Sequence, residues 1–258
     1  MSQELNTKDA SAGSPRERLP AIDLNRDAIF LDIDGTLLDI APTPEQVCVP
    51  ERLRQSLDQI MAATGGALAL VSGRTLESID SLFAPFKSAA IGCHGAQLRR
   101  SPHADCQMLA PSLPDSIKRA CADIPALLPG VRLEDKMFTL AFHCRLARDQ
   151  EKALLHQLRA RVELFESEYA LMAGKSVFEI KPRNSNKGAS LRALMRLPPF
   201  AGRRPVFFGD DTTDKYAFAV LSDFGGLGVS VGHRMPHAGF MVDTPHDVRL
   251  WLAALATR

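Results

Sequence analysis

The sequence predicts an α/β protein whose core is a parallel β-sheet flanked by helices on both faces. Short apolar runs alternate with helix-like segments over most of the 258 residues, which is the pattern of βαβ units. Two apolar runs end abruptly in closely spaced carboxylates, at the edge where open α/β sheets bind their ligands. Between about residues 104 and 181 the pattern changes, and the alternation then resumes. We therefore expect a core interrupted by an inserted α+β domain.

The first part of the core is predicted to run strand, helix, strand, helix, strand. Apolar side chains recur at helical spacing at Leu53, Leu57 and Ile60, and Gly65-Gly66 follows as a break. The runs on either side of this helix are uncharged and apolar, as expected of buried parallel strands. The predicted ranges are strand 28–31, helix 51–63, strand 67–71, helix 75–83 and strand 89–92.

The second part consists of the insert and the remainder of the core. In the insert we expect helices 115–127 and 149–164 and strands 131–134, 138–145 and 176–180. The core resumes with helix 187–196, strand 205–209, helix 213–221, strand 226–231 and helix 245–256. The core should thus occupy residues 21–103 and 183–258 and the insert residues 104–182, where it could close as a lid over a substrate.

Composition excludes several classes of protein. The net charge of +1 gives no electrostatic case for binding nucleic acid or an anionic membrane. The five cysteines are odd in number and lack the spacing of a zinc site, which favours thiols in a reducing compartment. No apolar run reaches the roughly 18 residues that a membrane span needs. Residues 1–20 are polar and lack a signal-peptide core, so we expect a disordered leader and a cytoplasmic protein.

The first candidate site follows the strand at 28–31, where the chain reads Asp32-Ile-Asp34-Gly-Thr. Two carboxylates this close repel each other unless a cation or a shared proton lies between them. A hard cation such as Mg²⁺ suits their oxygens. One carboxylate could then attack phosphorus while the other handles protons. The alternative interpretation is an acidic turn that merely ends a strand.

Two further positions suit a phosphate. Ser72 and Gly73 end the second strand at a loop that leads into a helix, where a hydroxyl and backbone N–H groups can hold an anion. A helix N-cap would explain Ser72 equally well. Lys187 begins a later helix, where a cation is unfavourable for the helix dipole and therefore indicates another role. The alternative for Lys187 is a surface lysine.

A second acidic cluster follows the strand at 205–209. Asp210, Asp211 and Asp214 are dense enough to need a cation, so we expect a metal site. We assign Asp210 as a direct ligand and Asp211 and Asp214 as partners that orient the site.

The order of these elements (Asp-x-Asp-Gly-Thr, then serine, lysine and the paired acids) resembles the haloacid dehalogenase superfamily of phosphohydrolases. Longer stretches resemble the trehalose-6-phosphate phosphatase family over roughly residues 27 to 253. These stretches are Leu133-Glu-Asp-Lys136, Phe138 to Arg145, Gly174-Lys-Ser-Val-Phe-Glu-Ile-Lys-Pro182 and Gly202 to Asp214. The resemblance implies a Rossmann-like core with an inserted cap.

This resemblance also implies a reaction: Mg²⁺-dependent hydrolysis of trehalose 6-phosphate, the last step of trehalose biosynthesis. Asp32 would become phosphorylated, and Asp34 would protonate the leaving sugar and then activate water. Lys187 would assist catalysis and, with Ser72 and Gly73, hold the phosphate. The metal would be held by Asp32, the Asp34 carbonyl and Asp210, with Asp211 and Asp214 in support.

The resemblance further assigns the sugar-binding side chains: Arg74, His94, Glu134, Lys136, Arg145, Lys175 and Glu179. Sugar hydroxyls need such donors and acceptors, although each residue could equally be a surface charge, and His94 a structural histidine. Three other functions remain open at this point. They are a phosphatase for another sugar phosphate, a phosphomutase, and a sugar-phosphate binder without turnover.

Overall fold

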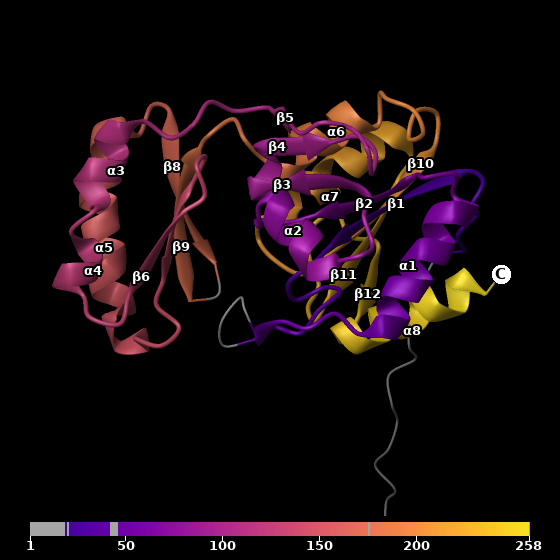
Figure 1. The fold of residues 1–258 in the computed structure, drawn as a ribbon, viewed down its shortest axis with the longest axis horizontal. Helices are drawn as coiled ribbons and strands as arrows, with labels where there is room; N and C mark the ends of the chain where they lie inside the picture. Colours follow the sequence, from indigo (N-terminus) through magenta and orange to yellow (C-terminus); the bar gives the residue numbers. More distant parts are fainter. Residues whose placement is uncertain (1–18, 20, 42–45, 175, 258) are drawn as a thin grey trace, which may run out of the picture.

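The larger of two sheets is built mainly from the apolar runs that the sequence marks as strands. The computed structural model describes residues 19, 21–41, 46–174 and 176–257, so the expected leader lies outside the described residues except for Leu19. In this part of the chain the strand order of the larger sheet is β12-β11-β10-β1-β2-β3-β4-β5 (Figure 1). The strands are β1 (Asp27–Asp32), β2 (Leu68–Val71), β3 (Ala89–Gly92), β4 (Gln97–Arg99), β5 (Gln107–Met108), β10 (Arg204–Gly209), β11 (Leu227–Val231) and β12 (Phe240–Val242).

Six of these strands are parallel, and β4 and β5 extend the edge as an antiparallel pair. Strand β1 lies between β10 and β2, because the chain runs outward from β1 to β3 and later returns on the other side of β1. This is the switch point of the sheet, where the carboxyl ends of two neighbouring strands open a crevice for ligands. Asp32 ends β1 and Asp210 follows β10, so both carboxylates reach this crevice.

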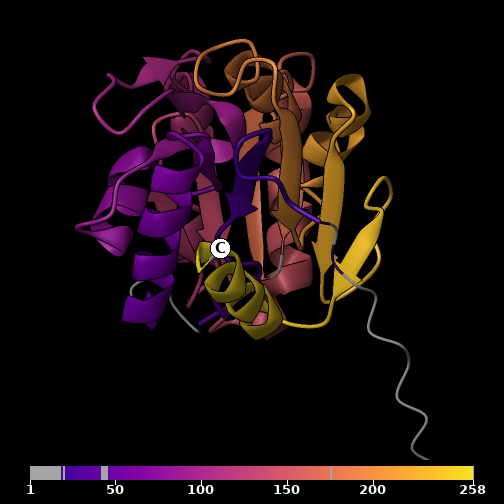
Figure 2. The ribbon, with the colours of Figure 1, turned by 90° about the vertical axis from the view of Figure 1, so that its right-hand side faces the viewer.

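Helices cover both faces of the larger sheet (Figure 2). Side chains alternate along β1, so that Ile29 and Leu31 pack on one face while Ala28 and Phe30 pack on the other. The first face carries α1 (Glu51–Ala63), α2 (Leu76–Phe83) and α8 (Pro245–Ala256), and the second carries α6 (Lys187–Leu194) and α7 (Lys215–Leu221). No helix in the described part of the chain has the length and hydropathy to span a bilayer. The predicted fold class of the core is confirmed.

The second sheet is antiparallel and has the strand order β6-β7-β9-β8. Its strands are β6 (Arg132–Asp135), β7 (Leu140–His143), β8 (Tyr169–Gly174) and β9 (Val177–Pro182), and its helices are α3 (Asp115–Cys121), α4 (Ile124–Leu127) and α5 (Glu151–Val162). One face buries Phe142 and Phe178 against these helices. The sheet lies between its helices and the larger sheet (Figure 1). We call this sheet and its helices the cap. Strand β5 falls within the range expected for the insert but pairs with β4 of the core.

The helix expected at 115–127 is divided in two. Pro125 has no N–H to donate to the carbonyl of Cys121, so the first helix ends and α4 begins with the proline near its start. The short 3₁₀ turns in the described chain are η2 (Cys93–Gly95), η3 (Arg148–Gln150), η4 (Glu163–Phe165) and η5 (Ser222–Phe224).

A buried ion pair fixes the start of β1 against β10. Asp27 is 1% exposed and accepts two hydrogen bonds of 2.8 Å from Arg204, and one of 2.9 Å from the backbone N–H of Asp23. Removing the cation would leave a buried carboxylate without its charge partner.

We expect Arg204→Ala to lower the free energy of unfolding by about 2–3 kcal/mol, less than for a fully enclosed pair because the guanidinium is partly in water. Urea denaturation of the purified variant measures this. The matched control is Arg192→Ala, which breaks an exposed pair with Asp223 and should change stability by less than about 1 kcal/mol. Equal effects of the two substitutions would contradict the structural role of Asp27.

Candidate active site

Four charged side chains from distant parts of the sequence meet at the switch point. The Nζ of Lys187 lies 2.6 Å from Oδ1 of Asp32 and 2.6 Å from Oδ1 of Asp214. Carboxylate oxygens of Asp32, Asp210 and Asp214 all lie within 4.8 Å of one another. These four side chains are buried, and we call them the acidic centre.

Local backbone geometry explains why these side chains converge. Gly35 has a φ of +92°, and a Cβ at this position would lie 2.2 Å from Oδ2 of Asp210, so glycine is required for the close approach. Asp214 fixes the turn after β10, because its Oδ2 accepts hydrogen bonds of 3.0 Å from the backbone N–H groups of Asp210 and Asp211. Asn186 caps α6 through a 2.9 Å bond from the N–H of Ala189, which makes Lys187 the first residue of the helix.

Burial dominates the electrostatics of the acidic centre. Burial raises the pKa of the Asp32 carboxyl well above its ordinary value; Lys187 opposes this rise, and the neighbouring carboxylates Asp214 and Asp210 add to it. For Lys187, burial alone would lower the pKa, but Asp214 and Asp32 more than offset it and raise the pKa, so the lysine stays charged. When all three carboxyls are ionised, the single ammonium leaves two excess negative charges in a buried space.

This arrangement fits a divalent cation. Carboxylate oxygens are the preferred ligands of hard cations, and Asp32, Asp210 and Asp214 lie close enough together to hold one such ion. A dication would balance the excess charge. It would also lower the pKa of Asp32 and leave that carboxylate ionised. Neither the side chain of Asp211 nor that of Asp34 is in this group. The Oδ1 of Asp211 accepts bonds from the backbone N–H and the hydroxyl of Thr212.

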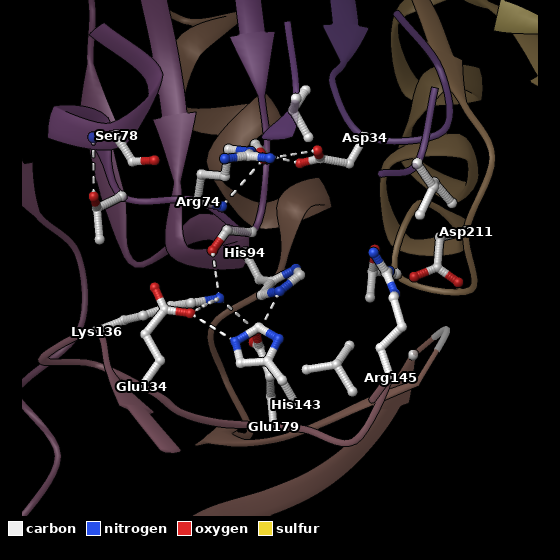
Figure 3. Close-up of a pocket in the computed structure, with 18 of the residues that line it drawn as sticks. Asp34, Arg74, Ser78, His94, Glu134, Lys136, His143, Arg145, Glu179 and Asp211 are labelled. Carbon is white, nitrogen blue, oxygen red and sulfur yellow. Dashed lines mark hydrogen bonds and ion pairs between the residues drawn. The ribbon is translucent and has the colours of Figure 1, made fainter. Parts of the chain in front are cut away.

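Asp34 lies beside the acidic centre and is held by Arg74. The Nε and Nη2 of Arg74 each donate a 2.7 Å hydrogen bond to a different oxygen of the Asp34 carboxylate (Figure 3). Arg74 belongs to the loop after β2, where Oγ of buried Ser72 accepts a 3.1 Å bond from the N–H of Arg74. The structure thus brings Arg74, predicted to bind substrate, onto the carboxylate predicted to handle protons.

The cap reaches the core through Glu179 of β9. One oxygen of Glu179 lies 2.6 Å from Nζ of Lys136, and the other lies 2.9 Å from Nε2 of His94 in η2. Lys136 also donates a 3.3 Å bond to the carbonyl of Gly73. A Cβ on residue 73 would lie 2.3 Å from the His94 ring, so a glycine at this position lets the ring approach the loop after β2. Burial by itself raises the pKa of Glu179, but Lys136 and His94 outweigh it and hold the pKa well below its ordinary value of 4.5.

The lowered pKa of Glu179 makes part of the stability depend on pH. Above about pH 4.5 the group is ionised in both the folded and the unfolded chain, and its ion pairs contribute fully. Below that pH the unfolded chain takes up a proton that the folded chain does not, which removes about 1.4 kcal/mol of stability per pH unit.

We expect Glu179→Gln to be less stable at pH 7 but to lose about 1–2 kcal/mol less than wild type between pH 4.5 and 3. Urea denaturation at the two pH values measures this, with exposed Glu163→Gln as control. A variant whose curve parallels the wild type would contradict the assignment.

The cap and the core enclose a cavity of about 650 Å³. Nearly all of the site residues predicted from sequence line it. They are Asp32, Asp34, Ser72, Gly73, Arg74, His94, Glu134, Lys136, Arg145, Glu179, Lys187, Asp210 and Asp211. Asp214 is fully buried and is absent from the lining, and Lys175 lies outside the described residues.

Thr36 and His143 are among the polar residues at the site that the sequence analysis missed. Thr36, fully buried, donates a 3.2 Å hydrogen bond to Oδ1 of Asp210. Thr36 directly follows Gly35 in the first motif, and the sequence alone explains it adequately as a turn residue. His143 lines the cavity from the end of β7, with Nε2 2.8 Å from Oε2 of Glu134. The signal that could have found it is the alternation of side chains along the strand expected at 138–145, in which His143 shares a face with Arg145.

Comparison with known proteins gives a consistent relationship. The family model described as trehalose-phosphatase matches residues 30–238. The chain is 40% identical over 234 residues to trehalose-6-phosphate phosphatase of Escherichia coli K12, covering 89% of this chain and 86% of that protein. It is 38% identical to a probable trehalose-phosphate phosphatase of Sinorhizobium fredii, covering 98% and 97% of the two chains.

Solved structures agree with the fold. A trehalose-6-phosphate phosphatase related protein matches with a TM-score of 0.75 and 26% identity, over 89% of this chain and 97% of its own. The C-terminal domain of Candida albicans trehalose-6-phosphate phosphatase matches with a TM-score of 0.77 and 22% identity, over 90% and 92% of the two chains. The family model covers most of the chain and the E. coli relative shares 40% of the aligned positions. On this basis the chain belongs to the trehalose-phosphatase family, which is a family of phosphatase enzymes.

Proposed function

We propose that this protein hydrolyses trehalose 6-phosphate to trehalose and phosphate. The observation that carries the proposal is the acidic centre, which opens onto a cavity whose opposite wall is the polar face of the cap sheet. The centre has the charges needed to transfer a phosphoryl group, and the cap supplies donors and acceptors for sugar hydroxyls. The names of the relatives support trehalose as the sugar.

In the proposed first step, the carboxylate of Asp32 attacks phosphorus and the P–O bond to the sugar breaks. Lys187 and the loop with Ser72 and Gly73 hold the phosphoryl oxygens, which lowers the energy of the charge that builds on them. Asp34 gives its proton to the departing sugar oxygen. Because both oxygens of Asp34 accept bonds from Arg74, proton donation requires this ion pair to open and the carboxylate to carry a proton, which it gains from water in the second step of the preceding turnover.

In the second step, Asp34 removes a proton from water, and the water oxygen attacks the phosphorus of the aspartyl phosphate. The bond to Asp32 breaks and free phosphate leaves. We propose Mg²⁺ as the cation, held by Asp32 and Asp210, with Asp214 and Asp211 orienting the ligands and the Asp34 carbonyl as a further ligand. When bound, it supplies positive charge that neutralises the transferring group.

The test is phosphate release from trehalose 6-phosphate, sucrose 6-phosphate and glucose 6-phosphate, with and without Mg²⁺. A strong, metal-dependent preference for trehalose 6-phosphate is the expected result. Release from another sugar phosphate would keep the reaction but discard the proposed role of the cap. Transfer of the phosphoryl group back to sugar without free phosphate would identify a phosphomutase, and binding without any release would identify a sensor.

A further inference from the structure

The cavity-facing side of the cap sheet is organised in two rows of side chains. The strand register aligns Glu134, Ala141, Glu179 and Met172 in one row and Arg132, His143, Val177 and Gly174 in the next. Except for Ala141, every member of both rows lines the cavity. The first row contains the glutamates expected to bind the sugar. His143 stands in the second row, one row away from Glu134, and the proposed reaction gives it no role.

The imidazole of His143 contacts the side chain of Glu134 in the neighbouring row. Its Nε2 lies 2.8 Å from Oε2 of the carboxylate, a short contact that requires a hydrogen on Nε2 because the acceptor is anionic (Figure 3). Lys136 Nζ lies 4.0 Å from the same oxygen but is already bound to Glu179 at 2.6 Å. The bond from His143 is accordingly the closest described contact of the Glu134 carboxylate. It also lowers the pKa of the Glu134 carboxyl, against the opposing effect of burial.

Without this bond, Glu134 would be poorly ordered. The residue is on β6, an edge strand of the cap sheet, and its side chain is 47% exposed. A glutamate in that setting samples several rotamers, and fixing it on substrate binding would reduce affinity. The histidine side chain is 27% exposed and is flanked by Arg132 and Val177 in its row, so it can act as the fixed partner. Among the described residues, Oε1 of Glu134 has no hydrogen-bond partner, which leaves it available to a hydroxyl donor.

We propose that His143 is a positioning residue that orients the Glu134 carboxylate to accept hydroxyl groups of the substrate's sugar. His143 thereby contributes to the selection of sugar phosphates over phosphate esters that lack hydroxyl groups. This inference rests on the proposed function for the identity of the sugar. It assigns His143 no part in the chemistry at phosphorus, because His143 contacts Glu134 and belongs to the cap, whereas the acidic centre belongs to the core.

The kinetic test compares His143→Leu and His143→Gln with wild type, using trehalose 6-phosphate and p-nitrophenyl phosphate at saturating Mg²⁺. We expect His143→Leu to reduce kcat/KM for the sugar phosphate about 10- to 100-fold, mainly through KM, and that for the aryl ester less than about twofold. His143→Gln keeps an N–H donor and should recover part of the loss. The matched control is His156→Leu, an exposed position on α5, which should change neither substrate. Equal losses with both substrates would overturn the proposal.

A double-mutant cycle tests whether His143 acts through Glu134. In a Glu134→Gln background, adding His143→Leu should cost less than about twofold further, since the group to be oriented has already changed. Losses that multiply would show that His143 acts independently and would overturn the positioning role. Thermal unfolding of each variant separates a loss of fold from a loss of recognition.

A measurement without substrate separates this inference from the proposed function. The ¹⁵N signals of the His143 ring in the free protein should show a protonated Nε2 that shifts when Glu134 is changed to Gln. An unchanged ring signal would overturn the inference whatever the substrate. If wild type shows no preference for trehalose 6-phosphate, the proposed function fails. The ¹⁵N signal of the His143 ring then still tests the role of His143. So does the double-mutant cycle with Glu134, measured with whichever sugar phosphate the enzyme hydrolyses best.

Discussion

Replacing Asp32 by asparagine is expected to abolish phosphate release while leaving the protein folded. An amide cannot form the acyl phosphate, so the loss should be about 10⁴-fold or more. Folding should not suffer, because burial disfavours the ionised form of Asp32, and Lys187 keeps a second partner at 2.6 Å in Asp214. Steady-state assays with trehalose 6-phosphate and Mg²⁺ measure the activity, and thermal unfolding measures the fold.

Two further observations make this result specific to the nucleophile. Rapid quench of wild type with ³²P-labelled substrate should trap protein-bound phosphate, and Asp32→Asn should trap none. Asp58→Asn on the exposed side of α1 is the matched control and should keep full activity. Substantial turnover by a well-folded Asp32→Asn variant would remove Asp32 as the nucleophile and with it the proposed first step.

Replacing Lys187 by methionine should reduce both activity and stability. Methionine keeps much of the side chain's length but removes the ammonium that lies 2.6 Å from each of two buried carboxylates. The rate should fall about 10²- to 10³-fold, the effect typical of losing one group that stabilises a transition-state charge. Breaking a buried ion pair by removing one partner destabilises a protein by about 3–5 kcal/mol, so the variant should also unfold more easily.

The pH dependence of this variant should reveal the cause. Burial already raises the pKa of Asp32, and Lys187 opposes that rise. Without Lys187 the Asp32 carboxyl would hold its proton to a higher pH in the folded than in the unfolded chain, so stability should rise as the pH falls from 8 to 5. The stability deficit relative to wild type should therefore shrink on acidification, and it should also shrink when Mg²⁺ is added. Urea denaturation at both pH values tests this. Lys215→Met, at an exposed lysine of α7, is the control. It should leave activity unchanged and should cost at most about 1 kcal/mol of stability, since among the described residues it removes only the contact of Nζ with the Tyr216 ring 5.0 Å away. A deficit that is constant with pH would indicate lost packing instead of unpaired charge.

The core of the fold could be predicted from sequence where elements carry strong local signals. β1, β2, β3, β10 and β11 are apolar runs, and α1 has regular helical spacing with buried Leu53 and Leu57. Strand β8 was not predicted, since Tyr169–Gly174 has residues of mixed preference and becomes a strand by pairing along β9. Strands β4, β5 and β12 are two or three residues long and also exist only through their neighbours.

The sequence by itself predicted which residues would carry the chemistry. Carboxylates placed directly after buried parallel strands must emerge at one edge of the sheet, so the positions of Asp32 and Asp210 in the chain assign both to a common site. Which of the site's side chains contact one another was decided only by the tertiary structure. Arg74 binds Asp34, Asp214 joins the buried centre while Asp211 does not, and His143 holds Glu134. These contacts join residues that are distant in sequence or lie on different strands. Their geometry depends on strand register and on the closeness of cap to core, which local sequence patterns do not encode.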